Sequence, residues 1–214
     1  MGKVIAIDGP SGSGKSTISK RLSERLGFQF LDTGALYRAV ALYLRSSNLT
    51  HETGDAAVRS ALDGVSVYFK DDRVFLNDMD VSEEIRTPEA GHYASVFSAR
   101  KAVRDFLLQI QRDAAIYNDI VAEGRDMTTV VFPDAWRKFY LDASEESRAQ
   151  RRYLQLKGKG PSVTMEEALK DVSDRDKRDS ERDIAPLKRA EDAIYIDTTH
   201  MTLEEVTTAI LSYL

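Results

Sequence analysis

Short apolar runs alternate with amphipathic stretches through most of the chain. Five runs of three or four residues have the length and the flanks of buried strands, and they lie at 4–7, 28–31, 120–122, 139–141 and 193–196. Between them, apolar residues recur at helical spacing, as at Ile18, Leu22 and Leu26. Strands and helices that alternate in this way predict an α/β fold, in which helices cover both faces of a parallel sheet.

Three later helices are also predicted. Apolar periodicity predicts one helix over 101–117. Two more begin at capping boxes, in which a threonine and a glutamate three residues later satisfy first-turn backbone amides. These pairs are Thr164 with Glu167 and Thr202 with Glu205.

Two segments interrupt the alternation. Apolar runs at 65–69 and 74–76 flank the polar stretch 70–73, a pattern that predicts an antiparallel hairpin. This element, at about 62–82, is an insertion between the second and third core strands. The second segment, at 157–161, follows an arginine-rich helix, and its glycines and proline cannot continue that helix. We expect it to be a mobile loop.

Composition narrows the class of protein. A chain of 214 residues with 42% hydrophobic and 30% charged residues is the size of one packed domain, which we take as 1–214. No apolar run approaches the roughly 18–20 residues that span a bilayer, so no membrane partner is expected. The first eight residues are too short and end too acidic for a signal peptide, and no cysteine is present. A cytoplasmic location is therefore expected.

The charge distribution favours a small polyanion over a polymer. The net charge of −5 and the pI near 5.3 argue against nucleic-acid binding, which needs a basic surface. Residues 148–189 hold 12 Lys and Arg against 8 Asp and Glu, so this segment is locally basic. It suits a polyanionic small molecule, although by itself a solvated charged helix is the better explanation of this segment.

One motif carries specific chemistry. The first strand is followed by Gly9, Pro10, Ser11, Gly12, Ser13, Gly14, Lys15, Ser16 and Thr17, which fit the pattern G-x-x-x-x-G-K-[ST]. Glycines let successive backbone N–H groups point inward, and the following helix adds positive potential for phosphates. Lys15 is predicted to reach the β- and γ-phosphates and Ser16 to bind Mg²⁺. The motif predicts ATP or GTP binding and does not indicate which reaction follows.

Three acidic residues lie at or near strand ends, where ligands bind in this type of fold: Asp8, Asp32 and Glu123. Glu123 or Asp32 is a candidate to orient Mg²⁺ or its waters. Capping of the following helices accounts for them equally well, so the sequence leaves both alternatives open.

Four further segments carry long motifs, at 31–38, 80–88, 123–134 and 175–187. They read LDTGALYR, DVSEEIRTP, EGRDMTTVVFPD and RDKRDSERDIAPL. Together with the glycine-rich loop, they closely resemble bacterial cytidylate kinases from about residue 4 to residue 206. The resemblance implies a P-loop fold of three α/β/α layers with a doubly wound, five-stranded parallel sheet. It also implies a small antiparallel monophosphate-binding insert at about 62–95, a lid at about 151–163, and a monomer.

The same resemblance implies individual roles. The acceptor phosphate would be held by Thr33, Arg38, Arg125 and Arg182. The base would be recognised by Ser95, Arg104 and Asp126, and the ribose by Arg175 and Asp179. Near the transferred phosphoryl group lie Arg148, Arg151 and Arg152, of which Arg148 is assigned to ATP binding and Arg151 to catalysis. Lys15, Arg125 and Arg182 complete the predicted catalytic set.

Side-chain chemistry supports part of this assignment independently. Cytosine offers a 4-amino donor and the acceptors N3 and O2, which match a carboxylate such as Asp126 and a guanidinium such as Arg104. Uracil reverses the polarity at positions 3 and 4, so selectivity against uridine monophosphate is expected. Arg175, Arg178 and Arg182 share one face of a predicted helix, and an ordinary salt-bridged surface is the alternative explanation.

Two positions depart from the family pattern: Glu123 replaces an aspartate, and Thr128 replaces a glycine. Neither removes a charge that the chemistry requires. The expected reaction is Mg²⁺-assisted in-line transfer of the ATP γ-phosphoryl group to CMP or dCMP, giving CDP or dCDP and ADP. The alternatives are another small P-loop kinase, acting on UMP, AMP or a metabolite, and a nucleotide-binding regulator without activity.

Overall fold

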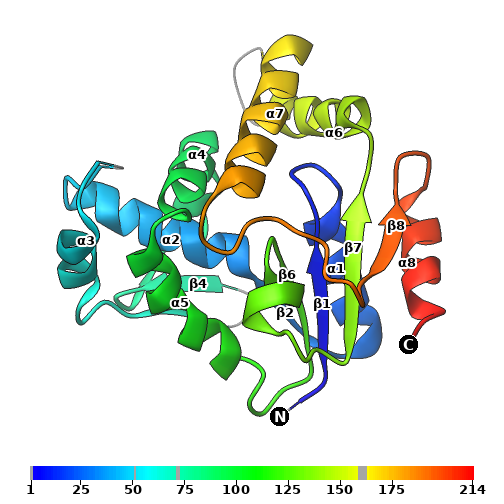
Figure 1. Ribbon diagram of the computed structural model, residues 1–214, viewed down its shortest axis with the longest axis horizontal. Helices are drawn as coiled ribbons and strands as arrows, with labels where there is room; N and C mark the ends of the chain where they lie inside the picture. The colour runs from blue at the N-terminus through cyan, green and yellow to red at the C-terminus, as the bar shows by residue number, and fades with distance from the viewer. Residues whose placement is uncertain (1, 51, 71–72, 159–162) are drawn as a thin grey trace.

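The five predicted strands form one parallel sheet in the computed structural model, which describes residues 2–50, 52–70, 73–158 and 163–214. The strands are β1 (Val4–Asp8), β2 (Gln29–Asp32), β6 (Ile120–Gly124), β7 (Arg137–Asp142) and β8 (Ile194–Asp197). Their order is β2-β6-β1-β7-β8, and every neighbouring pair is parallel (Figure 1). β1 is central, and the order reverses beside it, so the doubly wound sheet is confirmed. The glycine-rich loop leaves the sheet at this reversal.

Alternation along β1 divides the core between the two faces. Ile5 and Ile7 pack with α1 (Lys15–Leu26) and α8 (Leu203–Leu211). Val4 and Ala6 pack in the other core cluster, with α2 (Thr33–Ser46) and α5 (Lys101–Asp113), and α3 (Asp55–Leu62) packs against α5. Because successive side chains of a strand point to opposite faces, a fully apolar strand must be covered on both.

The predicted hairpin is present, although residues 71–72 of its turn lie outside the described residues. β3 (Val67–Lys70) and β4 (Arg73–Leu76) pair antiparallel, and β5 (Met79–Asp80) adds a third strand. The rings of Tyr68 and Phe75 stack across the first pair, with their centroids 5.3 Å apart. The 3₁₀ turn η1 (Glu84–Arg86) and α4 (Pro88–Phe97) follow. The insert boundaries of 62–95 remain a prediction.

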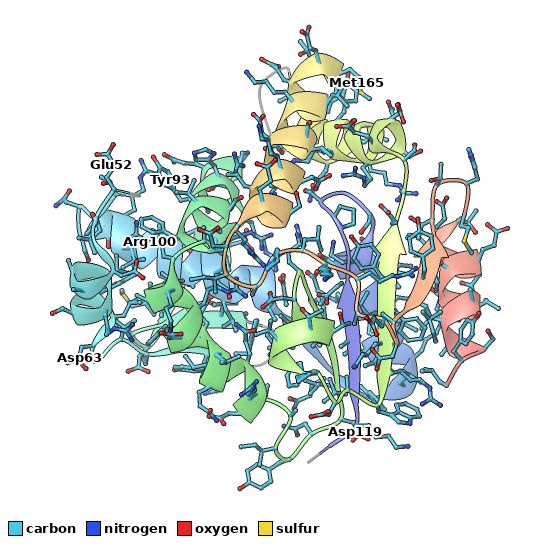
Figure 2. The ribbon with its side chains drawn as sticks, in the orientation of Figure 1. Glu52, Asp63, Tyr93, Arg100, Asp119 and Met165 are labelled. Carbon is cyan, nitrogen blue, oxygen red and sulfur yellow. The ribbon has the colours of Figure 1, made fainter. Side chains whose placement is uncertain are left out.

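The helices α6 (Glu145–Lys157) and α7 (Met165–Glu181) pack against each other at the end of the sheet toward which the β7 arrow points (Figure 1). Met165, at the start of α7, and Asp119, just before β6, lie at opposite ends of the molecule (Figure 2). Both predicted capping boxes are confirmed, at the first turns of α7 and α8. In the predicted lid of 151–163, residues 159–162 lie outside the described residues, and so does most of the predicted mobile loop.

The helix predicted over 101–117 ends earlier, at Asp113. Past Asp113 the N–H groups of Ala115 and Ile116 donate to the carbonyl oxygens three residues before them, and the carbonyl oxygen of Ala115 accepts from the N–H of Gly2 at 2.9 Å. That bond attaches the turn before β6 to the residues that precede β1. Among the described helices, none is long and apolar enough to cross a membrane.

Candidate active site

The loop between β1 and α1 has the backbone that its glycines predict. Gly9, Gly12 and Gly14 have φ of 151°, 77° and 92°. A Cβ on Gly9 would lie 1.9 Å from the carbonyl oxygen of Leu141 on β7, so no side chain fits there while β7 stays in place. The loop is thus a preformed cradle at the N-terminus of α1, where backbone amides favour phosphate.

Lys15 is folded onto this loop. Its Nζ donates to the carbonyl oxygen of Pro10 at 2.7 Å and to Ser13 Oγ at 3.2 Å, and the residue is buried. Burial, followed by the charge of Arg125, lowers the pKa of Lys15 to about 7. A phosphate in the cradle would favour the charged amine and so reverse this shift.

The structure separates the two candidate metal-orienting acids. Glu123 Oε1 accepts from Ser16 Oγ at 2.7 Å, whereas Asp32 Oδ1 accepts from the N–H of Ala35 at 3.0 Å and caps α2. The two acids are register partners on β6 and β2. Burial first, and then the charge of Glu123, raises the pKa of Asp32 to about 6. Glu123 is therefore the acid that faces Ser16.

Asp8 has a different task. Its carboxylate is fully buried and accepts from the N–H of Met127 at 2.9 Å, the N–H of Thr128 at 2.7 Å and Thr128 Oγ1 at 2.6 Å. These bonds fix the start of η2 (Met127–Val131), a short π-helical turn that directly follows Arg125 and Asp126. Thr128, one of the two departures from the family pattern, supplies two of the three donors.

A cavity of about 660 Å³ joins the glycine-rich loop to the acceptor residues. All nine predicted acceptor-binding residues line it: Thr33, Arg38, Ser95, Arg104, Arg125, Asp126, Arg175, Asp179 and Arg182. They come from α2, α4, α5, α7 and the segments after β6 and α7, so chain folding gathers residues far apart in sequence. Their individual roles remain predictions.

Two buried carboxylates organise the arginines of this cavity. Asp126 pairs with Arg104, and its Oδ1 lies 3.6 Å from Arg182 Nη2. Asp179 Oδ2 accepts from Arg125 Nε at 2.8 Å. Burial acts to raise the pKa of Asp179, but the charges of Arg125 and Arg182 outweigh it and hold this pKa below its usual value. Asp179 is thus an ionised partner for guanidinium groups.

The remaining acceptor-side residues are held by contacts within the protein. Arg178 Nε donates to Ser95 Oγ at 3.1 Å, and Arg175 Nη2 donates to the carbonyl oxygen of Gly91 at 3.3 Å, which joins α7 to α4. Thr33 Oγ1 donates to the carbonyl oxygen of Glu123 at 2.7 Å. Arg38 Nη1 lies 3.9 Å from Asp32.

Arg182 does not share the helix face predicted for it. α7 ends at Glu181, and Arg182 is its C-cap, with extended backbone at φ −66° and ψ 141°. The chain turns there because Ala185 adopts φ 49° and the N–H of Leu187 bonds the carbonyl oxygen of Asp179 at 2.7 Å. Among the described residues, Arg182 Nη2 is buried without a hydrogen-bond acceptor.

The three arginines of α6 have distinct surroundings. Arg151 donates to Thr198 Oγ1 at 3.0 Å and to the carbonyl oxygen of Thr198 at 2.6 Å, and it lines the cavity. Arg152 lines it too and donates to Asp171 at 2.7 Å. Arg148 is buried outside the cavity lining and bonds the loop backbone, so its ATP-binding role remains a prediction.

Sequence reasoning missed a further wall of the cavity. The segment after β8 contributes Thr198, Met201, Thr202, Leu203 and Val206. Thr198 Oγ1 also donates toward the carbonyl oxygens of Ser13 and Asp142, at 3.2 and 2.9 Å. The available signal was the position of this segment, directly after a parallel strand at the edge of the sheet where ligands bind.

A glycine-rich phosphate loop at the carboxyl edge of a parallel sheet, facing a cavity lined with arginines, defines the class of P-loop phosphotransferases. The cytidylate kinase family model matches residues 5–214, and the chain belongs to that family. The cytidylate kinase of Thermodesulfovibrio yellowstonii is 53% identical over 219 aligned positions, which cover 99% of this chain and 97% of that protein. That of Thermosipho melanesiensis is 51% identical over 207 positions, covering 97% and 94%.

Among solved structures, an uncharacterised protein from Eubacterium ventriosum superposes with a TM-score of 0.54 at 15% identity, covering 99% of this chain and 97% of that one. At this identity the likeness concerns the fold alone.

Proposed function

We propose that the protein transfers the γ-phosphoryl group of ATP to CMP or dCMP, giving ADP and CDP or dCDP. The proposal includes a cytoplasmic location and a monomeric state. One observation carries the proposed reaction: a single cavity holds a phosphate cradle at one end and two carboxylate–arginine clusters at the other. A second polyanion can therefore be held against the repulsion of the first.

On the donor side, the cradle would take the ATP phosphates, and Lys15 would exchange Pro10 for a phosphate oxygen. Ser16 Oγ and Glu123 Oε1, 2.7 Å apart, form an oxygen donor set of the kind that Mg²⁺ prefers. Ser16 would bind the ion and Glu123 would orient its waters. The metal would neutralise charge on the β- and γ-phosphates.

On the acceptor side, Asp126 is free to accept from the cytosine 4-amino group once it exchanges an arginine partner, while Arg104 donates to the ring. Ser95 adds a hydroxyl beside them. Arg175 and Asp179 would contact the ribose. The acceptor phosphate would be bound by Thr33, Arg38, Arg125 and Arg182.

Catalysis would consist of positioning and charge stabilisation. The attacking phosphate oxygen is already anionic, so no general base is required. Lys15, Arg125, Arg151 and Arg182 would stabilise the charge spread over the transferred group. Arg151, held by Thr198 beside the cradle, is the α6 arginine best placed for this task.

The test is coupled ADP release from Mg-ATP with CMP, dCMP, UMP and AMP offered separately. We expect turnover with CMP and dCMP and little with UMP or AMP. Asp126→Asn should lower the ratio of kcat/KM for CMP to kcat/KM for UMP, because an amide can donate to the uracil 4-carbonyl. As a matched control, Asp174→Asn changes an exposed aspartate of α7 outside the cavity lining and should leave the ratio unchanged.

A preference for UMP or AMP would leave a kinase but refute the roles given to Asp126 and Arg104. An absence of turnover with all four acceptors, despite ADP binding, would refute the proposed acceptor class.

A further inference from the structure

Asp176, on α7, contacts the phosphate loop directly. Its Oδ1 accepts from the backbone N–H of Ser11 at 3.0 Å, and its Oδ2 accepts from Arg148 Nη1. Ser11 and Asp176 are 165 positions apart in the chain. None of the roles assigned above includes this carboxylate.

Arg148 closes the contact into a ring. The same Nη1 donates to the carbonyl oxygen of Ser11 at 3.1 Å, and Nε donates to the carbonyl oxygen of Ala143 at 2.9 Å. Both backbone polar groups of Ser11 are therefore held, the N–H by Asp176 and the C=O by Arg148. Ser11 and Arg148 are only 6% and 8% exposed, so solvent competes little for these bonds.

An acid beside a phosphate cradle opposes phosphate binding unless another effect outweighs the repulsion. Here the guanidinium of Arg148 balances the charge, and the carboxylate accepts an amide of the loop. The arrangement favours anchoring of the loop over simple repulsion. Removing the charge should weaken phosphate binding if Asp176 anchors the loop and strengthen it if Asp176 only repels phosphate, so the two explanations can be separated.

The helix that bears Asp176 also serves the acceptor side. Arg175 bonds the backbone of α4, and Asp179, three residues after Asp176, binds Arg125. Residues three apart on a helix move together, so displacement of the acceptor-side residues displaces Asp176 as well.

We propose that Asp176 is a positioning residue that ties the phosphate loop to α7 and thereby couples the donor and acceptor sites. The coupling half of this inference rests on the proposed function, whereas the anchoring half does not. Because one helix contacts both sites, an acceptor that holds α7 in place should also strengthen donor binding.

The test measures the Kd of ADP by calorimetry, with and without saturating CMP, for the wild type, Asp176→Asn and Asp174→Asn. Loss of one hydrogen bond to a charged group predicts roughly tenfold weaker ADP binding in D176N. The CMP-induced gain in ADP affinity should disappear, while the Kd of CMP alone stays unchanged. D174N should match the wild type in the Kd of ADP, in the CMP-induced gain in ADP affinity and in the Kd of CMP. Asp176→Glu, which keeps the charge opposite Arg148, should give intermediate values and serves as the second variant if D176N folds poorly.

Equal or tighter ADP binding in D176N would overturn the anchoring role in favour of repulsion. Equal weakening of ADP and CMP, with a lower melting temperature, would reduce Asp176 to a structural ion pair and overturn the proposal. The ADP arm requires no acceptor, so failure of the CMP assignment would leave its outcome intact and be recognised separately.

Discussion

Replacing Thr128 by valine removes one hydroxyl from a buried carboxylate and nearly preserves side-chain shape. Thr128 Oγ1 donates to Asp8 at 2.6 Å, and both residues are buried. A hydrogen bond to a charged group contributes about 1.5–3 kcal/mol, and one to a neutral group about 1 kcal/mol. The stability that valine removes should therefore depend on the ionisation of Asp8.

The direction of this dependence follows from the pKa. Burial raises the pKa of Asp8 from 3.8 to about 6, although the hydrogen bonds from Thr128 act to lower it. The folded protein thus binds this proton more tightly than the unfolded chain, and stability falls as pH rises from 3.8 to about 6. At about 1.4 kcal/mol per unit, the full effect is about 3 kcal/mol. Without the Thr128 hydroxyl the pKa rises further, so the loss continues to higher pH.

Denaturant unfolding at pH 5 to 8 would measure this effect. We expect T128V to cost about 1 kcal/mol at pH 5, where Asp8 is neutral in the folded state, and about 2–3 kcal/mol at pH 8. Measuring the cost of T128V again in an Asp8→Asn background cancels the titration of other groups, including Asp32. A T128V cost that is independent of pH, or equally pH-dependent in the Asp8→Asn background, would refute the reasoning.

Two further predictions concern the loop and the acceptor cavity. Gly9→Ala should weaken ADP binding about 10- to 100-fold, because its Cβ would meet the Leu141 carbonyl oxygen. The control Gly27→Ala, at φ 68° with nothing within 4 Å of the added Cβ, should lower the free energy of unfolding by only about 1 kcal/mol. Unchanged ADP binding in G9A would contradict the geometry. Arg104→Ala leaves Asp126 buried beside Arg182 alone and should cost about 3–5 kcal/mol in denaturant unfolding, against less than about 1 kcal/mol for Arg45→Ala in the exposed pair with Glu89. Similar costs for the two arginines would show that the Asp126 pair is not stabilising.

The fold was largely predictable because its main signals are local. Apolar runs marked the five strands, and the capping residues of α7 and α8 are a few positions from the amides that they satisfy. The glycine-rich loop was recognisable because its conformation depends on glycine itself, as at Gly9. The end of α5 was predicted too late because apolar residues continue past Asp113, whereas the chain there already leaves the helix in i→i+3 turns.

The contacts of the charged side chains could not be predicted in the same way. Asp32 and Glu123 lie at the ends of neighbouring strands and were equivalent candidates, yet Asp32 caps α2 and Glu123 faces Ser16. Arg148 and Arg151 are three apart on α6, but only Arg151 lines the cavity. Helical spacing determines which residues share a face, whereas the partner on that face is determined by tertiary packing.

The acceptor end of the cavity is held together by the same charges that would bind the nucleotide. Arg104 and Arg125 each contact a buried aspartate, and Arg182 lies within 4.0 Å of both Asp126 and Asp179. An arriving phosphate must therefore compete with carboxylates for these guanidinium groups. If the phosphate draws Arg182 away, Asp126 would lose a partner and become the acceptor that the proposed recognition of a cytosine amino group requires. Under the proposed function, phosphate binding and base recognition would then be parts of one exchange of ion pairs, which a base without its phosphate could not complete.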